Sequence, residues 1–124
     1  MKTVEQEIQE KGLDAPRVTP ADIEAEIASE HYFTALQGAR MEGLDFIDKL
    51  GQVPAPMPLR PELGLLTFCV LVLRNGFTVT GQSACASPEN FDEMLGRKIA
   101  RQNAASNIWP LLGYVLRSEL ASRQ

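Results

Sequence analysis

The clearest pattern of hydrophobic and polar positions lies between residues 63 and 84. An unbroken apolar run, LGLLTFCVLVL, is followed by Asn75-Gly76 and then by the alternating stretch FTVTGQSA. Asn-Gly between two strand-like runs is the strongest short-range signal of a β-hairpin, because a tight primed turn needs a positive φ at both positions. The pattern therefore predicts a hairpin with strands at about 64–74 and 77–84.

Placing Asn75-Gly76 at the turn centre also predicts the register, in which Val72 faces Val79. In this register Cys69 and Cys85 point to opposite sides of the hairpin, which disfavours a disulfide. The first strand is apolar on both faces, so its second face must be covered by more of this chain or by another copy. We favour another copy, and hence a homo-oligomer. The predicted partner face consists of Leu71, Leu73, Thr78 and Thr80.

Helical patterns lie on both sides of the hairpin. After it, periodic apolar residues predict a helical hairpin with helices at about 88–105 and 108–121, capped by Ser87 and Asn107. Before it, Thr19 and Pro20 begin a predicted short helix over about 20–29. The aromatic segment HYFTA that follows favours a strand.

The remaining segments set the predicted domain boundaries. Residues 1–18 are polar and lack sustained periodicity, so they are expected to form a mobile arm. Prolines at 54, 56, 58 and 61 predict an extended connector over 53–62, and the segment between HYFTA and this connector is ambiguous. The sequence thus predicts one α+β domain over 19–124, with a small antiparallel sheet followed by the helical hairpin.

Composition narrows the class of protein. With 124 residues, 23% charged residues and a net charge of −4, the chain suits one soluble domain, and nucleic-acid binding over its whole surface is disfavoured. The longest apolar run is too short to cross a membrane, and the charged N-terminus does not resemble a signal peptide. We therefore expect a cytoplasmic protein with free cysteines and no membrane partner.

The chain contains no recognisable catalytic motif. Its two cysteines and single histidine lack zinc-ligand spacing, and no glycine-rich phosphate loop is present. Cys85 lies between a strand and a helix start, but acidic residues at that helix start oppose a reactive thiolate. We expect no metal, no cofactor and no enzymatic activity, and we interpret Cys85 as a packing residue.

The best candidate site is the basic cluster Arg97, Lys98 and Arg101. Arg97 has Glu93 one helical turn before it, whereas Arg101 has no acidic residue at helical spacing. One interpretation is that these cations complement the helix dipole or pair with an acid elsewhere in the fold. The other is an anion-binding site, with Asn90 or Asn103 reading polar edges of a phosphate-containing ligand.

A family resemblance adds to this picture. The stretch from LLTFCVLVLRNGF to NIWPLLGYVLRSEL resembles a family of small tailed-phage and prophage proteins, named after gene product forty-nine of one podovirus and gene product sixty-six of another. The resemblance implies a phage accessory protein in the bacterial cytoplasm. Such proteins often act by binding, and counter-defence is one common role. The hairpin-plus-helices architecture is also similar, more distantly, to phage sponge proteins that sequester nucleotide immune signals, such as the Thoeris anti-defence proteins.

Three functional hypotheses follow. The first is a non-enzymatic accessory protein that sequesters an anionic, nucleotide-type signal through Arg97 and Arg101. The second is an inhibitor or adaptor that binds a host protein through the apolar hairpin face. The third is a DNA-associated regulator, which the acidic net charge disfavours.

Overall fold

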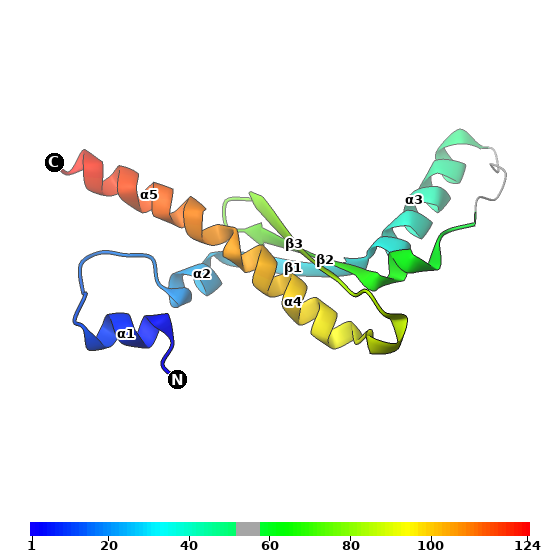
Figure 1. The fold of residues 1–124 in the computed structure, drawn as a ribbon. Helices are drawn as coiled ribbons and strands as arrows, with labels where there is room; N and C mark the ends of the chain where they lie inside the picture. Colours follow the sequence, from blue (N-terminus) through cyan, green and yellow to red (C-terminus); the bar gives the residue numbers. More distant parts are fainter. Residues whose placement is uncertain (52–57) are drawn as a thin grey trace.

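A three-stranded antiparallel sheet forms the centre of the molecule. The structure is a computed structural model that describes residues 1–51 and 58–124. The strands lie in the order β1 (Ile27–Thr34), β2 (Leu66–Leu73) and β3 (Thr78–Ala84). The sheet and the helices around it (Figure 1) confirm the predicted α+β class.

The hairpin turn differs from the predicted one. The Leu73 N–H donates to the Phe77 carbonyl at 2.8 Å, and the Gly76 N–H donates to the Leu73 carbonyl at 2.9 Å, so the loop has three residues, 74–76. Gly76 has φ of 89°, and among the described residues only glycines have positive φ. Asn75 instead accepts the Phe77 N–H with its side chain at 2.9 Å. The predicted two-residue primed turn is therefore wrong, and glycine is needed at one position, as in three-residue hairpin loops.

This longer loop shifts the register by one residue, which exchanges the two faces of a strand. Leu71 faces Val79 instead of Thr80, so the predicted face assignment is wrong. Leu71 and Leu73 are core residues with 0% and 4% exposure, whereas Thr78 and Thr80 are exposed on the opposite side. In this register the alternation of the two strands assigns Cys69 and Cys85 to the same face of the hairpin, so the prediction that they point to opposite sides is also wrong. Both cysteines are free thiols.

Helix α4 (Glu93–Ser106) covers the face of the sheet that carries Leu71. Its small residues Ala100 and Ala104 are fully buried, and they lie against Gly81 of β3. The helix begins later than predicted, with Asp92 accepting the Leu95 N–H as the cap. Ser87 makes no side-chain cap, and the residues after it form the short 3-10 helix η2 (Pro88–Asn90).

Helix α5 (Ile108–Ser122) matches its predicted range but not its predicted packing. Asn107 ends α4 and begins α5 in a helical conformation, with φ −78° and ψ −9°. One residue leaves no loop for a chain reversal, so the two helices run end to end instead of forming a helical hairpin (Figure 1). Pro110 lies in the first turn of α5, where its missing N–H removes no hydrogen bond within that helix.

The other elements extend the molecule at both ends. Helix α2 (Pro20–Glu26) ends before the predicted boundary because β1 begins at Ile27. The ambiguous segment forms α3 (Ala35–Leu50), which packs on the 3-10 helix η1 (Pro61–Leu65).

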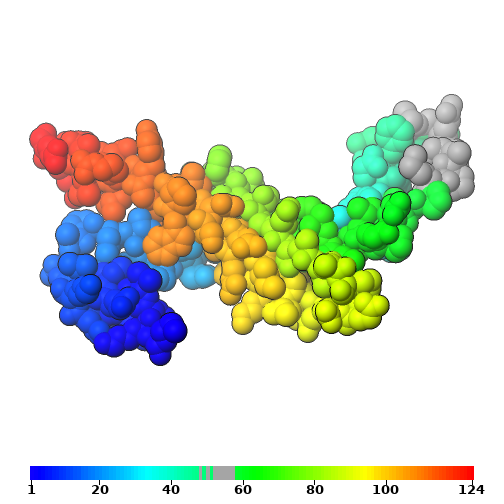
Figure 2. Space-filling view, in the orientation of Figure 1, coloured from blue at the N-terminus to red at the C-terminus, as the bar shows by residue number. Residues whose placement is uncertain are grey.

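The space-filling view (Figure 2) shows the resulting elongated outline, with α5 and the N-terminal segment at one end and α3 at the other. The N-terminal arm contains α1 (Val4–Glu10), held to Arg17 by its ion pair with Glu5. Residues 53–57 of the predicted connector lie outside the described residues. Across the described ranges, no helix combines the length and apolarity that a membrane crossing requires.

Candidate functional site

Arg101, the main candidate from the sequence, is engaged by two carboxylates of its own chain. Its Nε donates to Glu30 at 2.8 Å, and its Nη1 and Nη2 donate to the two oxygens of Glu24 at 3.1 and 2.8 Å. The side chain is 29% exposed. These hydrogen bonds lower the pKa of both glutamates and raise that of Arg101. A bidentate contact plus a third charge-assisted bond satisfies most of the guanidinium donors.

The tertiary fold brings these groups together from three elements. Glu30 pairs with Leu71 in the sheet register, so its side chain belongs to the face that α4 covers. Glu24 comes from α2, which leads directly into β1. Both acids are more than 70 residues away from Arg101 in the chain. No local spacing signals such a pairing, although an acid elsewhere in the fold was one of the open interpretations.

Arg97 lies one turn before Arg101 and extends the same cluster. Its guanidinium lies 5.3 Å from the ring centre of Tyr32, within cation–π range, and its Nη2 donates to Glu93 at 3.3 Å. Tyr32 donates its hydroxyl to Glu30 at 3.1 Å. Burial, followed by this bond to Glu30, raises the pKa of Tyr32 to about 12. We call Glu24, Glu30, Tyr32, Arg97 and Arg101 the α4 arginine cluster.

The remaining predicted site residues lie apart from this cluster. Asn103 donates its side-chain N–H to the Gln82 carbonyl at 2.8 Å, and Asn107 donates likewise to Thr80 at 2.8 Å. Both carbonyls belong to the edge strand β3, so the two asparagines satisfy backbone groups that the edge of the sheet would otherwise leave unpaired. Asn90 lies in η2, and Lys98 makes no ion pair within the described residues.

The structure supports few chemical roles for these groups. Each arginine of the α4 arginine cluster already contacts a carboxylate, so the cluster offers an incoming anion little uncompensated positive charge. Burial raises the pKa of the Cys69 thiol, opposite to what a cysteine nucleophile needs. Among the side chains that the structure describes, no group of three histidine, cysteine or acidic residues could hold a metal ion.

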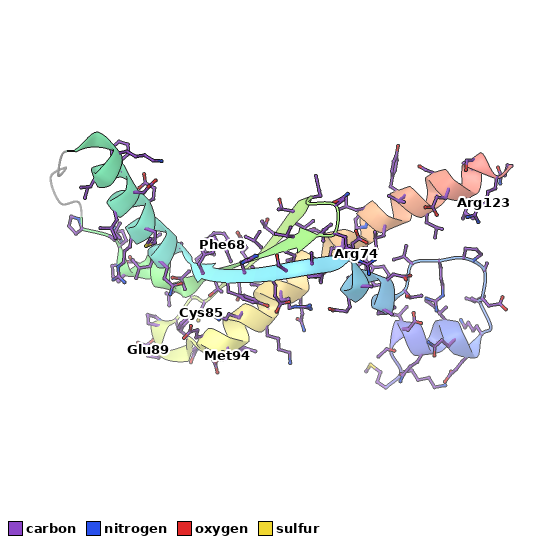
Figure 3. All side chains as sticks on the ribbon, turned by 180° about the vertical axis from the view of Figure 1, so that it is seen from behind. Phe68, Arg74, Cys85, Glu89, Met94 and Arg123 are labelled. Atoms are coloured by element: carbon purple, nitrogen blue, oxygen red, sulfur yellow. The ribbon has the colours of Figure 1, made fainter. Side chains whose placement is uncertain are left out.

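The side of the sheet opposite α4 forms a second surface, and its residues differ from those that the predicted register placed together. Figure 3 shows the molecule from behind, with the strands in front of α4. In β2, Thr67 to Leu73 alternate between core residues and partly exposed Phe68, Val70 and Val72. We call the side opposite α4 the open sheet face. It consists of Ser29, His31, Phe33, Leu66, Phe68, Val70, Val72, Thr78, Thr80, Gln82 and Ala84.

Comparison with known proteins identifies a phage family. Residues 18–120 match the family model described as the phage protein (N4 Gp49/phage Sf6 gene 66) family. The match spans the sheet, α3, α4 and nearly all of α5. Neither the curated proteins nor the solved structures contain a significant match to this chain.

Proposed function

The chain belongs to the phage protein family named after N4 Gp49 and phage Sf6 gene 66, and from that premise we propose that it is a non-enzymatic accessory protein that binds a host protein. The observation that carries this proposal is the apolar surface of α5. Trp109, Tyr114 and Val115 are 42%, 77% and 52% exposed, and their spacing distributes them around the helix. A helix that is apolar on several sides is normally buried in a core or an interface.

The chemistry of these side chains fits a protein partner. Tryptophan and tyrosine are enriched among the residues that dominate binding energy, and an apolar helix commonly docks into a groove of its partner. Figure 1 shows α5 projecting beyond the sheet, where a partner can reach it. The proposed partner is a protein of the bacterial cytoplasm that presents an apolar groove.

Native mass spectrometry of the full chain, isolated from cells with and without phage infection, tests this proposal. We expect a discrete complex with a host protein, which Tyr114→Glu weakens because it places a charge in the apolar contact. Arg117→Glu on the same helix is the matched control, since it adds a negative charge without removing an aromatic group. Equal weakening by both variants, or no protein complex in either sample, contradicts the proposal.

Sequestration of an anionic, nucleotide-type signal is the second candidate. It is supported by Lys98, which makes no ion pair within the described residues, and by Arg97, whose side chain is 36% exposed. The internal pairing of Arg101 weighs against it. The same spectra distinguish the two candidates, because a retained nucleotide-sized mass that Lys98→Glu abolishes would favour sequestration and overturn the host-protein proposal.

A further inference from the structure

The open sheet face is the side of the sheet that α4 leaves uncovered. Within β2, alternate residues differ sharply in burial. Cys69 and Leu71 are fully buried under α4, whereas Phe68 and Val70 next to them retain exposure. Phe33 of β1 packs against Phe68 with ring centres 5.6 Å apart, and Phe33 is still 38% exposed. A central strand whose second apolar face is only partly covered is typical of a sheet that another layer covers.

We propose that this second layer is the same face of another copy of this chain, packed about a twofold axis. A face that meets itself must be self-complementary, and like charges across such a contact repel. Three residues come from β1, four from β2 and four from β3, and none of these eleven is Asp, Glu, Lys or Arg. With 23% charged residues in the chain, a surface of that size would carry about two or three charges by composition alone.

The accessible area of the chain also fits a dimer. The chain exposes 9230 Å², whereas a compact monomer of 13.7 kDa exposes about 6,600 Å². The excess of about 2,600 Å² is well above the roughly 800 Å² that each partner buries in a standard protein interface. An extended chain of this kind reaches an ordinary ratio of surface to volume when a second copy covers part of it.

Helix α3 enlarges the contact beyond the sheet. A Cβ added to Gly38 would lie 3.6 Å from the Phe33 ring, so α3 rises beside one end of the open sheet face. Met41 and Leu44 follow Gly38 at three-residue spacing and are 65% and 61% exposed. Three strands alone cover about 14 by 25 Å. The first turns of α3 add apolar surface that brings the contact toward standard size.

Charge introduced on this face, midway along the edge strand β3, tests the proposal. Thr80 is exposed and pairs with Val70 in the sheet register, so Thr80→Lys is tolerated by a single folded chain. In the dimer it places one lysine from each copy in a dry contact. We expect the dissociation constant to rise at least about 100-fold, as for an unpaired buried charge. The matched control is Gln102→Lys, on the exposed side of α4.

Sedimentation equilibrium of the purified full chain and both variants gives the readout, with circular dichroism as the check of folding. We expect the wild-type chain and Gln102→Lys to show twice the chain mass of 13.7 kDa, and Thr80→Lys to show the monomer mass. A wild-type monomer at concentrations of tens of micromolar overturns the proposal. A Thr80→Lys dimer overturns it as well, because the copies then associate elsewhere. Neither outcome depends on whether the host-protein proposal holds.

Discussion

The contact between Gly81 of β3 and the backbone of α4 predicts a large effect for one added methyl group. In Gly81→Ala, the new Cβ would overlap the amide nitrogen of Ala104 and the carbonyl oxygen of Ala100, and it would lie 2.7 Å from the carbonyl carbon of Asn103. All three atoms belong to the helix backbone, so no side-chain rotation relieves the overlap. Carbon contacts are optimal at about 3.5–4.0 Å. The helix must therefore move outward by about 1 Å or more.

That movement weakens several interactions at once. Overpacking in a close-packed core typically costs about 1–3 kcal/mol. The hydrogen bond from Asn103 to Gln82 and that from Asn107 to Thr80 lengthen as α4 withdraws, at about 1 kcal/mol each. We therefore expect Gly81→Ala to lower the free energy of unfolding by about 3–5 kcal/mol. That is a large part of the roughly 5–15 kcal/mol typical of a domain.

Urea denaturation followed by circular dichroism measures this change. The matched control is Gly113→Ala in α5, where an added Cβ meets no atom within 4 Å. Alanine is favoured over glycine inside a helix by up to about 1 kcal/mol, so this control should be neutral or stabilising. If Gly81→Ala lies within 1 kcal/mol of the wild type, α4 does not pack on β3 at this distance and our account of the core is wrong.

Two further predictions concern polar groups near α4. Arg101→Ala should lower stability by about 1 kcal/mol at pH 7, since Glu24 and Glu30 are partly exposed and screened. Arg101 lowers the pKa of both carboxylates, so the stability difference between variant and wild type should be largest above about pH 4.3 and should shrink as pH falls through the lowered pKa values. Urea titrations at pH 7 and pH 3 measure this difference, and a difference that does not change with pH contradicts the prediction. The Thr67 hydroxyl is buried without a hydrogen-bond partner, so Thr67→Val should raise the unfolding free energy by about 1 kcal/mol in thermal denaturation, whereas a loss of stability would mean that the hydroxyl is satisfied.

The candidate site shows which contacts local sequence patterns can predict and which they cannot. Helical spacing correctly placed Arg97 near Glu93 and indicated that Arg101 lacks a local acidic partner. The actual partners of Arg101 lie in α2 and β1, which the sequence did not predict to lie beside α4. Sequence patterns report neighbours within about one helical turn or one hairpin, whereas this cluster requires three elements to be docked.

The amino-acid sequence by itself determined the α+β class, the two strands of the hairpin, the range of α5 and the phage family, because these follow from local periodicity and motif. Only the tertiary structure decided which face of β2 is the core. A single extra loop residue, Arg74, shifts the register by one position. Because strand faces alternate with a period of two, Leu71 then lies on the same face as Val79, and Val70 lies on the opposite face. The tertiary structure also decided that α4 and α5 run end to end, because the packing of helices depends on the surfaces they dock against and not on helix propensity.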